Sequence, residues 1–296
     1  MRVSRSQSGG EQYLALQSIA RATGQGFEQL AVLYALEGFL RRLAASDVRD
    51  AFVLKGGVLL AAFDARRPTR DADRLVLDLD TDRANVEAKI GSIASIDVAD
   101  GLALDVASVT SEVIRNEDEY SGIRVKLNYA LATMHVRIGI DVNVGDPVHP
   151  MPQRITVPGL LADDVALLGY PMAAVIAEKA VTAMQRGAAN TRWRDWADIH
   201  VLSARHVFDS DGLAGACNAV AAHRGTEVVL IAALLPDYPG IAQAKWVAWR
   251  RRPDFVDGLP EAFADVLRAV SDFVDPPLGE LTARSVWDPM SRTWQP

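Results

Sequence analysis

The spacing of hydrophobic positions changes about half-way along the chain. In the first half, apolar side chains recur at helical spacing over 27–45, and short apolar or alternating runs occupy 50–54, 71–79, 122–129 and 135–144. Apolar positions three or four residues apart indicate an amphipathic helix, whereas short runs rich in alternating or β-branched residues indicate strands. The first half is therefore predicted to be an α/β (α+β) domain.

The second half has a mainly helical pattern. A proline-rich stretch over 146–152 marks a boundary, and strand-like content falls away after about Pro158. Helical spacing then predicts four helices, over 172–186, 193–205, 211–220 and 259–274. We predict two domains, an α/β domain over 1–158 and a helical domain over 159–296.

Composition narrows the class of protein. The chain has 296 residues, of which 49% are hydrophobic, and its formal charge is 31 − 38 = −7. This acidic balance excludes a globally basic nucleic-acid binder, so any RNA contact needs a local basic patch. The longest apolar run, Val228–Leu235, is far shorter than the roughly 20 residues of a membrane span. With no secretory signal and a single cysteine, Cys217, which we expect to be a small buried residue, the sequence predicts a soluble cytoplasmic protein without a membrane partner.

A pair of aspartates, Asp71 and Asp73, lies in one predicted strand. Residues two apart on a strand point to the same side, with Cα atoms roughly 6.6 Å apart. Two carboxylates held in this way can bind hard divalent cations, which prefer oxygen ligands and phosphate partners. Such cations neutralise a triphosphate and lower the pKa of an attacking hydroxyl. The alternative is a surface ion-pair cluster with Arg67, Arg70 and Arg74.

Three further acids, Asp78, Asp80 and Asp82, alternate directly after this pair. They lie at the end of the strand and before a helix predicted over 83–95. A role in capping that helix is therefore preferred for them over a metal site.

A lysine and two glycines, Lys55, Gly56 and Gly57, follow the first predicted strand. A turn without side chains lets backbone N–H groups approach phosphate oxygens, and a helix starting at Val58 would add the attraction of its N-terminus. Lys55 could place a positive charge beside the same phosphates. Thr69 places a hydroxyl just before the aspartates.

A third carboxylate, Asp141, lies in an otherwise apolar strand, where it shares a face with Gly139 and Asn143. It is the natural candidate for a ligand of the second metal ion and for the base that accepts a proton from the acceptor. Arg124 and Lys126 lie on one face of the preceding strand. They could reach the phosphates, but ordinary surface charges are an equal alternative.

A second group of charged residues lies in the helical half. Lys179 belongs to the helix predicted over 172–186, which we expect Gly187 to end. Asp195 and Asp198 share a face of the next helix because they are three residues apart. Lys179 could bind a triphosphate as a point charge, with Asp198 orienting it. The alternative is a helical hairpin held together by salt bridges.

The segment Lys245–Arg252 interleaves Trp246 and Trp249 with basic residues. The tryptophans could stack on RNA bases while the basic residues meet the RNA backbone. The preferred alternative is an amphipathic helix with its tryptophans packed inward.

The Lys-Gly-Gly and Asp-x-Asp pattern with a later third acid resembles the core of the DNA polymerase β-like nucleotidyltransferase superfamily. Together with Ala-Glu-Lys179 and Arg186-Gly-x-x-Asn-Thr-Arg-x-x-Asp-x-x-Asp198, it resembles the AbiEii/MenT nucleotidyltransferase toxins over about residues 50–205. The resemblance implies a polymerase β-like domain with a mixed sheet, followed by a mainly helical domain. It also implies use of an NTP and Mg²⁺ or Mn²⁺, transfer of a nucleotide to the 3′ end of tRNA, a block of translation, and a cognate antitoxin.

The resemblance also assigns roles to individual residues. It matches Asp71 and Asp73 to the metal carboxylates, Asp141 to the third acid, and Thr69 to the hydroxyl residue before the aspartates. It matches Lys179 and Asp198 to the essential lysine and acid of the second domain. The expected protein is therefore a nucleotidyltransferase toxin acting on RNA. The alternatives are a nucleotidyltransferase acting on a protein or a small molecule such as an antibiotic, and a non-catalytic nucleotide-binding module.

Overall fold

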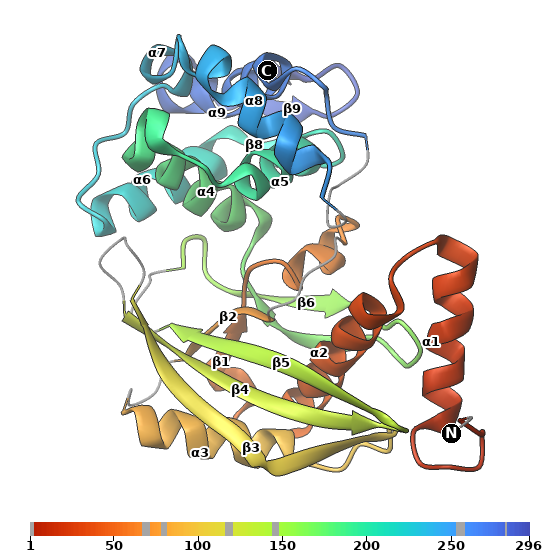
Figure 1. Cartoon of the computed structure of the whole chain (residues 1–296). Helices are drawn as coiled ribbons and strands as arrows, with labels where there is room; N and C mark the ends of the chain where they lie inside the picture. The colour runs from red at the N-terminus through yellow and green to blue at the C-terminus, as the bar shows by residue number, and fades with distance from the viewer. Residues whose placement is uncertain are drawn as a thin grey trace. The chain divides into compact units, whose positions relative to one another are not determined.

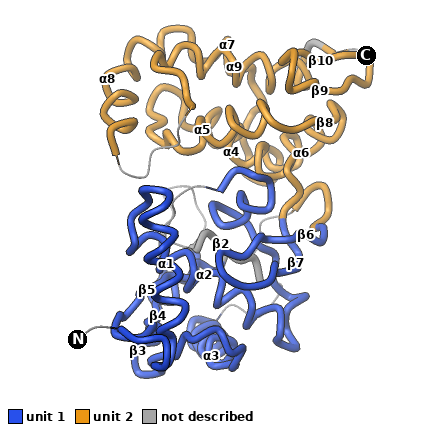
Figure 2. The backbone as a smooth tube through the Cα atoms, turned by 90° about the vertical axis from the view of Figure 1, so that its right-hand side faces the viewer, with its two compact units in different colours: residues 1–146, 153–169 blue, residues 147–152, 170–296 orange. Residues whose placement is uncertain are grey.

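The computed structural model describes residues 3–66, 72–77, 82–115, 121–143, 148–252, 258–281 and 283–296 of the chain. It divides into two compact units, of which unit 1 comprises 1–146 and 153–169, and unit 2 comprises 147–152 and 170–296 (Figure 2). Unit 1 extends past the predicted boundary at 158 because residues 159–169 contain a strand that pairs within its sheet.

In its described residues, unit 1 contains the α-helices α1 (Gly10–Thr23), α2 (Phe27–Ala45) and α3 (Arg83–Ala94). Gly24 ends α1 with a positive φ of 73°, the left-handed conformation common at helix C-termini. The side chain of Asp82 accepts hydrogen bonds from the backbone N–H groups of Ala84 and Asn85. The predicted capping role of Asp82 is therefore confirmed, while Asp78 and Asp80 lie outside the described residues.

A seven-stranded mixed sheet forms the centre of unit 1 (Figure 1). Its spatial order is β3-β4-β5-β2-β1-β7-β6, in which β2 is parallel to β5, β1 is parallel to β7, and the other neighbours are antiparallel. The strands are β1 (Phe52–Leu54), β2 (Ala72–Leu77), β3 (Leu102–Arg115), β4 (Ser121–Leu131), β5 (Met134–Asn143), β6 (Gln153–Val157) and β7 (Val165–Gly169). The mixed α/β fold class predicted from the sequence is confirmed, although β3, β6 and β7 were not predicted.

The two faces of β4 differ in burial. Alternate residues from Ile123 to Leu131 are buried on the side on which α3 packs against β4. The residues between them, Arg124, Lys126 and Asn128, are only partly buried. The helices therefore cover one face of this part of the sheet, and the opposite face carries polar side chains.

Unit 2 is mainly helical, with a three-stranded sheet in the order β10-β9-β8. Its helices are α4 (Met172–Arg186), α5 (Trp193–Ser203), α6 (Ser210–His223), α7 (Ile231–Leu234), α8 (Tyr238–Arg250) and α9 (Phe263–Asp275), and its strands are β8 (Phe208–Asp209), β9 (Val286–Asp288) and β10 (Thr293–Gln295). Cys217 is fully buried, as predicted, and burial raises the pKa of its thiol to about 12. Within the described parts of both units, no helix combines the length and apolar character that crossing a membrane requires.

An aromatic cluster forms part of the core of unit 2. Trp246 stacks against Trp249 with ring centroids 5.1 Å apart, and Trp193 and Phe263 contact Trp246 edge-on or tilted. Trp246 and Trp249 are 0% and 4% exposed. Their rings therefore pack inward, as in the preferred interpretation of this segment, and the base-stacking interpretation is wrong.

Candidate active site

The strand register of unit 1 brings together the backbone of three predicted site segments. Ala72 of β2 lies opposite Ile140 of β5, so Asp73 and Asp141 follow on adjacent parallel strands. Leu54 lies opposite Leu75, which places the turn after β1 at the end of the sheet where β2 begins. The side chain of Asp73 lies outside the described residues, as do Asp71 and Thr69 entirely.

Asp141 is a buried carboxylate, 6% exposed, and Arg124 of the neighbouring strand binds both of its oxygens. Arg124 donates from Nε to Oδ1 at 2.6 Å and from Nη2 to Oδ2 at 2.7 Å. The two residues are direct cross-strand partners, so β4 and β5 hold the planar guanidinium against the carboxylate.

Lys126 lies on the same face of β4 as Arg124, as predicted, but it has a different partner. Its Nζ lies 2.5 Å from Oε1 of Glu112 on β3, and both side chains are substantially exposed. The hydrogen bond from Lys126 lowers the pKa of the Glu112 carboxyl. Because the sequence did not predict β3, it gave no indication that Glu112 lies here.

The turn after β1 has the conformation expected of a glycine turn. Gly56 adopts a positive φ of 78°, and the preceding Lys55 is 2% exposed. The expected α-helix at Val58 is wrong, because a 3₁₀-helix of five residues, Leu59–Phe63, follows instead. A short 3₁₀-helix carries little of the aligned dipole of an α-helix, so the predicted attraction of a helix N-terminus is not present at this turn.

A buried charge network joins α4 and α5 in unit 2. Lys179 of α4 places its Nζ 2.7 Å from Oδ1 of Asp195 and 2.8 Å from Oδ2 of Asp198. Arg192 donates from Nε to the other oxygen of Asp195 at 2.6 Å. The prediction that the two aspartates share one face of a helix is confirmed, since both contact the same ammonium group.

The charges of this network favour the ionised form of Asp195. Burial raises the pKa of its carboxyl, but the positive charges and hydrogen bonds of Lys179 and Arg192 outweigh burial and leave the pKa below its usual range. Gly187, with a positive φ, ends α4 as predicted, and the short connection after it returns the chain to α5. The hairpin geometry therefore fixes Lys179 between two carboxylates.

Comparison with known proteins gives a family for the whole arrangement. The sequence model of the family described as nucleotidyl transferase AbiEii toxin, type IV toxin–antitoxin system, matches residues 38–270, a span that contains both groups of residues. The chain belongs to the AbiEii nucleotidyltransferase toxin family. It is therefore a nucleotidyltransferase of a type IV toxin–antitoxin family, and the resemblance inferred from its motifs is confirmed.

Two solved structures from Helicobacter pylori resemble the AbiEii-family chain. The crystal structure of JHP933 matches with a TM-score of 0.54 and 14% identity, over 86% of this chain and 94% of the other. That of a "putative nucleotidyltransferase" matches with a TM-score of 0.51 and 14% identity, over 92% of this chain and 99% of the other. At this identity the likeness shows a shared fold. No curated protein matches the sequence significantly.

The AbiEii family implies an NTP substrate, a divalent metal and an antitoxin partner. Asp141 on β5 and the position of Asp73 on β2 fit such a metal, because carboxylate oxygens are the ligands that Mg²⁺ and Mn²⁺ prefer. Among the side chains that the structure describes, no group of three or more His, Cys, Asp or Glu residues has metal-binding geometry.

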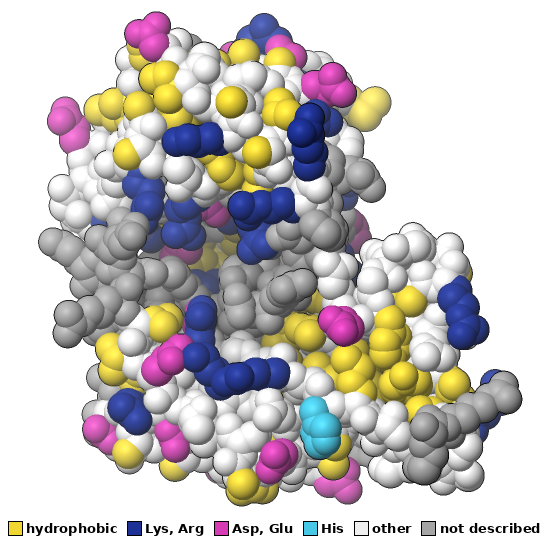
Figure 3. Space-filling model, in the orientation of Figure 1, with side chains coloured by type: hydrophobic (Ala, Val, Ile, Leu, Met, Phe, Trp, Pro, Cys, Tyr) yellow, Lys and Arg dark blue, Asp and Glu magenta, His cyan; other side chains and the backbone are white. Residues whose placement is uncertain are grey.

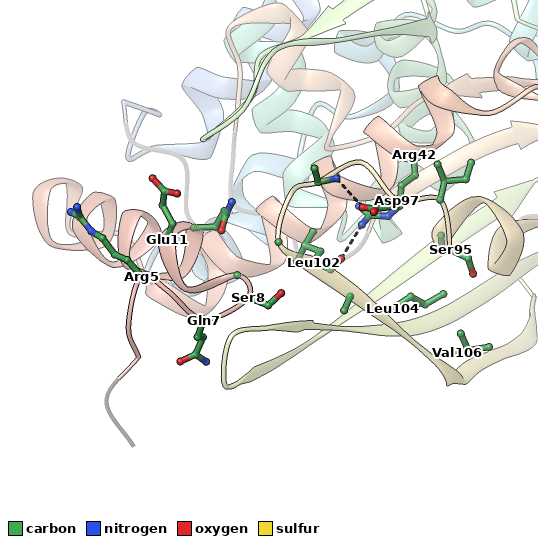
Figure 4. A pocket seen from close by; sticks show the side chains of 17 residues that line it. Arg5, Gln7, Ser8, Glu11, Arg42, Ser95, Asp97, Leu102, Leu104 and Val106 are labelled. Carbon is green, nitrogen blue, oxygen red and sulfur yellow. Dashed lines mark hydrogen bonds between the residues drawn. The ribbon is translucent and has the colours of Figure 1, made fainter.

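A separate cavity of about 600 Å³ lies in unit 1 between the segment before α1 and the start of β3 (Figure 4). Its walls include Arg5, Glu11, Arg42, Asp97 and Leu102. None of the predicted site residues lines it. The guanidinium of Arg42 is engaged with Asp100 and with the carbonyl of Leu102, so it holds the fold together at this position.

Proposed function

We propose that this nucleotidyltransferase transfers a nucleoside monophosphate from an NTP to the 3′ end of a tRNA, and thereby blocks translation in the cytoplasm. The observation that carries the catalytic part is the register of β2 and β5, which sets the Asp-x-Asp strand beside the buried carboxylate of Asp141. The family supports NMP transfer, whereas the RNA acceptor is our proposal.

Asp71, Asp73 and Asp141 are the proposed metal ligands, and Mg²⁺ or Mn²⁺ would supply charge neutralisation for the triphosphate and a lowered pKa for the attacking hydroxyl. The acceptor 3′-oxygen bonds to the α-phosphorus as the bond from that phosphorus to the pyrophosphate oxygen breaks. The hydroxyl proton goes to a carboxylate, for which Asp141 is the candidate, and pyrophosphate leaves with the electron pair.

The turn residues and the polar sheet face serve the triphosphate in this proposal. The positive φ of Gly56 lets the backbone after β1 turn without a side chain, and Gly57 continues that turn. Lys55, Arg124 and Lys126 supply positive charge on unit 1, and Thr69 supplies a hydroxyl next to the aspartates.

In unit 2, Lys179 and Asp198 are the proposed nucleotide-positioning residues, with Asp195 as the second anion that holds Lys179. The contacts at 2.7 and 2.8 Å fix the ammonium group in one position. A side chain fixed before substrate binds loses little entropy when it meets a phosphate. The network therefore supports a role in orienting the NTP.

A basic surface on unit 2 supports an RNA acceptor. Lys and Arg side chains gather over α4, α5 and the end of α8 (Figure 3). The exposed cations of these segments include Lys245 within α8, Arg251 and Arg252 directly after it, and Arg194 of α5. Clustered cations on a chain of net charge −7 form a local surface for a phosphate backbone.

The test is to incubate the protein with magnesium, each labelled NTP in turn, and total deacylated tRNA. The proposal expects label on RNA with at least one NTP, and loss of that label in Asp71→Ala. Label on protein or on a small molecule instead would retain the chemistry and overturn the RNA acceptor. If the Asp71→Ala variant transferred as much label to RNA as the unaltered protein does, the assigned site would be wrong.

A further inference from the structure

The ion pair between Arg124 and Asp141 occupies the carboxylate that the proposed metal site requires. Both oxygens of Asp141 accept from the guanidinium, at 2.6 and 2.7 Å. The Asp141 side chain is 8% exposed and that of Arg124 is 30% exposed. The acid is therefore enclosed, whereas its cation reaches toward solvent and can leave more easily.

A buried carboxylate needs a counter-ion. Leaving a buried charge unpaired is strongly unfavourable, and a side-on guanidinium compensates it through two charged hydrogen bonds. The two N–H groups of the Arg124 guanidinium occupy one binding position on each Asp141 oxygen, so a divalent cation and Arg124 compete for the carboxylate. Whichever cation binds Asp141 must also neutralise it.

We propose that Arg124 is the resident counter-ion of Asp141 and holds the metal site closed until the nucleotide arrives. The inference rests on the proposed function, since it takes Asp141 as a metal ligand. On loading, Arg124 releases at least one oxygen to the divalent cation and turns its guanidinium to a phosphate of the NTP. Metal without nucleotide then binds weakly, and metal with nucleotide binds strongly.

Arg137 provides a matched control on the same sheet face. It lies on β5 four residues before Asp141, opposite Asn128, and its side chain is exposed. Removing its charge changes the net charge of the protein by the same amount as removing that of Arg124. Replacing Arg137 leaves both hydrogen bonds from Arg124 to Asp141 in place.

The experiment is an electron paramagnetic resonance titration of Mn²⁺, with and without a non-hydrolysable NTP analogue. In the absence of nucleotide, Arg124→Gln should bind Mn²⁺ about tenfold more tightly than the unaltered protein, because a charged hydrogen-bonded competitor is lost. The ratio of Mn²⁺ affinity with nucleotide to that without nucleotide should be smaller in Arg124→Gln than in the unaltered protein. In Arg137→Gln this ratio should be unchanged. Equal or weaker Mn²⁺ binding by Arg124→Gln without nucleotide would overturn the proposal.

A thermal melt separates this result from a folding defect. Arg124→Gln should melt at a lower temperature without metal and gain more from added Mn²⁺ than the unaltered protein does, since metal replaces the missing counter-ion. Arg124→Gln that gains no more than Arg137→Gln would contradict the role of counter-ion. If the unaltered protein transfers no label to RNA but Arg124→Gln still binds Mn²⁺ more tightly than it does, this inference is retained and the proposed RNA acceptor is discarded.

Discussion

At the scale of single residues, the account depends on charges that the fold buries in pairs. Asp141 is matched by Arg124, and Asp195 and Asp198 are matched by Lys179. Such pairs add little net stability when compared with apolar packing, yet removing one partner is costly because a buried charge is left behind. The buried pairs therefore point to a role that apolar residues could not fill.

Replacing the ammonium group of unit 2 tests this reasoning. Lys179→Met should lower the free energy of unfolding by about 3–5 kcal/mol, because Asp195 and Asp198 lose their shared cation. Denaturation by urea, followed by tryptophan fluorescence, measures the change in unit 2, which contains all six tryptophans. The variant Lys179→Met/Asp195→Asn/Asp198→Asn should recover part of the loss. A single variant as stable as the unaltered protein would show that the network is not electrostatically coupled.

A buried histidine in α5 gives a prediction for pH. Burial, with a contribution from the positive charge of Arg292, lowers the pKa of His200 to about 4. The unfolded chain therefore takes up this proton at a higher pH than the folded chain. The free energy of unfolding should fall by up to roughly 3 kcal/mol as pH drops from about 6.5 to 4.

Asp195 does not contribute in that window. Its lowered folded-state pKa gives stability that is fully present above its unfolded pKa and is lost only in stronger acid. His200→Gln should therefore flatten the unfolding profile between pH 6.5 and 4. An equally steep profile in this variant would assign the pH dependence to other groups.

At the scale of elements, helices were predicted well where a hydrophobic stripe and a clear end coincide. The bounds of α2 and α4 match the predicted ranges, with Gly187 ending α4. β3 escaped prediction because its register shifts between Asp105 and Thr110, which breaks the alternation of apolar and polar positions. It is also an edge strand with exposed Val106 and Val113 on a sheet whose order depends on long-range pairing.

In the candidate site too, local helical contacts were predicted and contacts that depend on strand pairing were not. Asp195 and Asp198 could be paired from sequence because a helix repeats locally, whereas the contact between Arg124 and Asp141 needs the register of two strands. The sequence placed both residues on strands but gave no reason to join them. Glu112, on the unpredicted β3, could not be found at all.

The turn after β1 supplies a prediction at this scale. Gly56 has a φ of 78°, where a side chain introduces strain, so Gly56→Ala should cost about 1–2 kcal/mol and displace the backbone beside the predicted phosphate site. The expected result is weaker NTP binding, measured by calorimetry. Gly240→Ala is the control, because an added Cβ at Gly240 would have no neighbouring atom within 4 Å and Gly240 has no positive φ. Unchanged NTP affinity in Gly56→Ala would remove this turn from the nucleotide site.

At the scale of the whole molecule, the acidic chain and its local basic surface make a prediction about salt. If Lys245, Arg251 and Arg252 contact RNA phosphates, replacing all three with Gln should weaken RNA binding for every sequence. It should also reduce the slope of log affinity against log salt concentration by roughly two to three. Filter binding at several salt concentrations measures both quantities.

A second triple variant gives the control for that experiment. Arg268, Arg284 and Arg292 lie outside α4, α5 and α8, and replacing them with Gln changes the net charge equally. This variant should retain the original salt slope. Equal slopes in both triple variants would mean that the α8 end does not meet the RNA backbone.

The central claim is that carboxylates on adjacent strands β2 and β5 catalyse nucleotide transfer. The most direct measurement is the single-turnover rate of NMP transfer in Asp73→Asn, compared with Asp82→Asn, which alters an acid of the same kind at the cap of α3. Metal-ligand loss should slow transfer by about a thousandfold or more in Asp73→Asn, while Asp82→Asn retains the original rate because asparagine also caps helices. Transfer by Asp73→Asn at the rate of the unaltered protein would contradict the account.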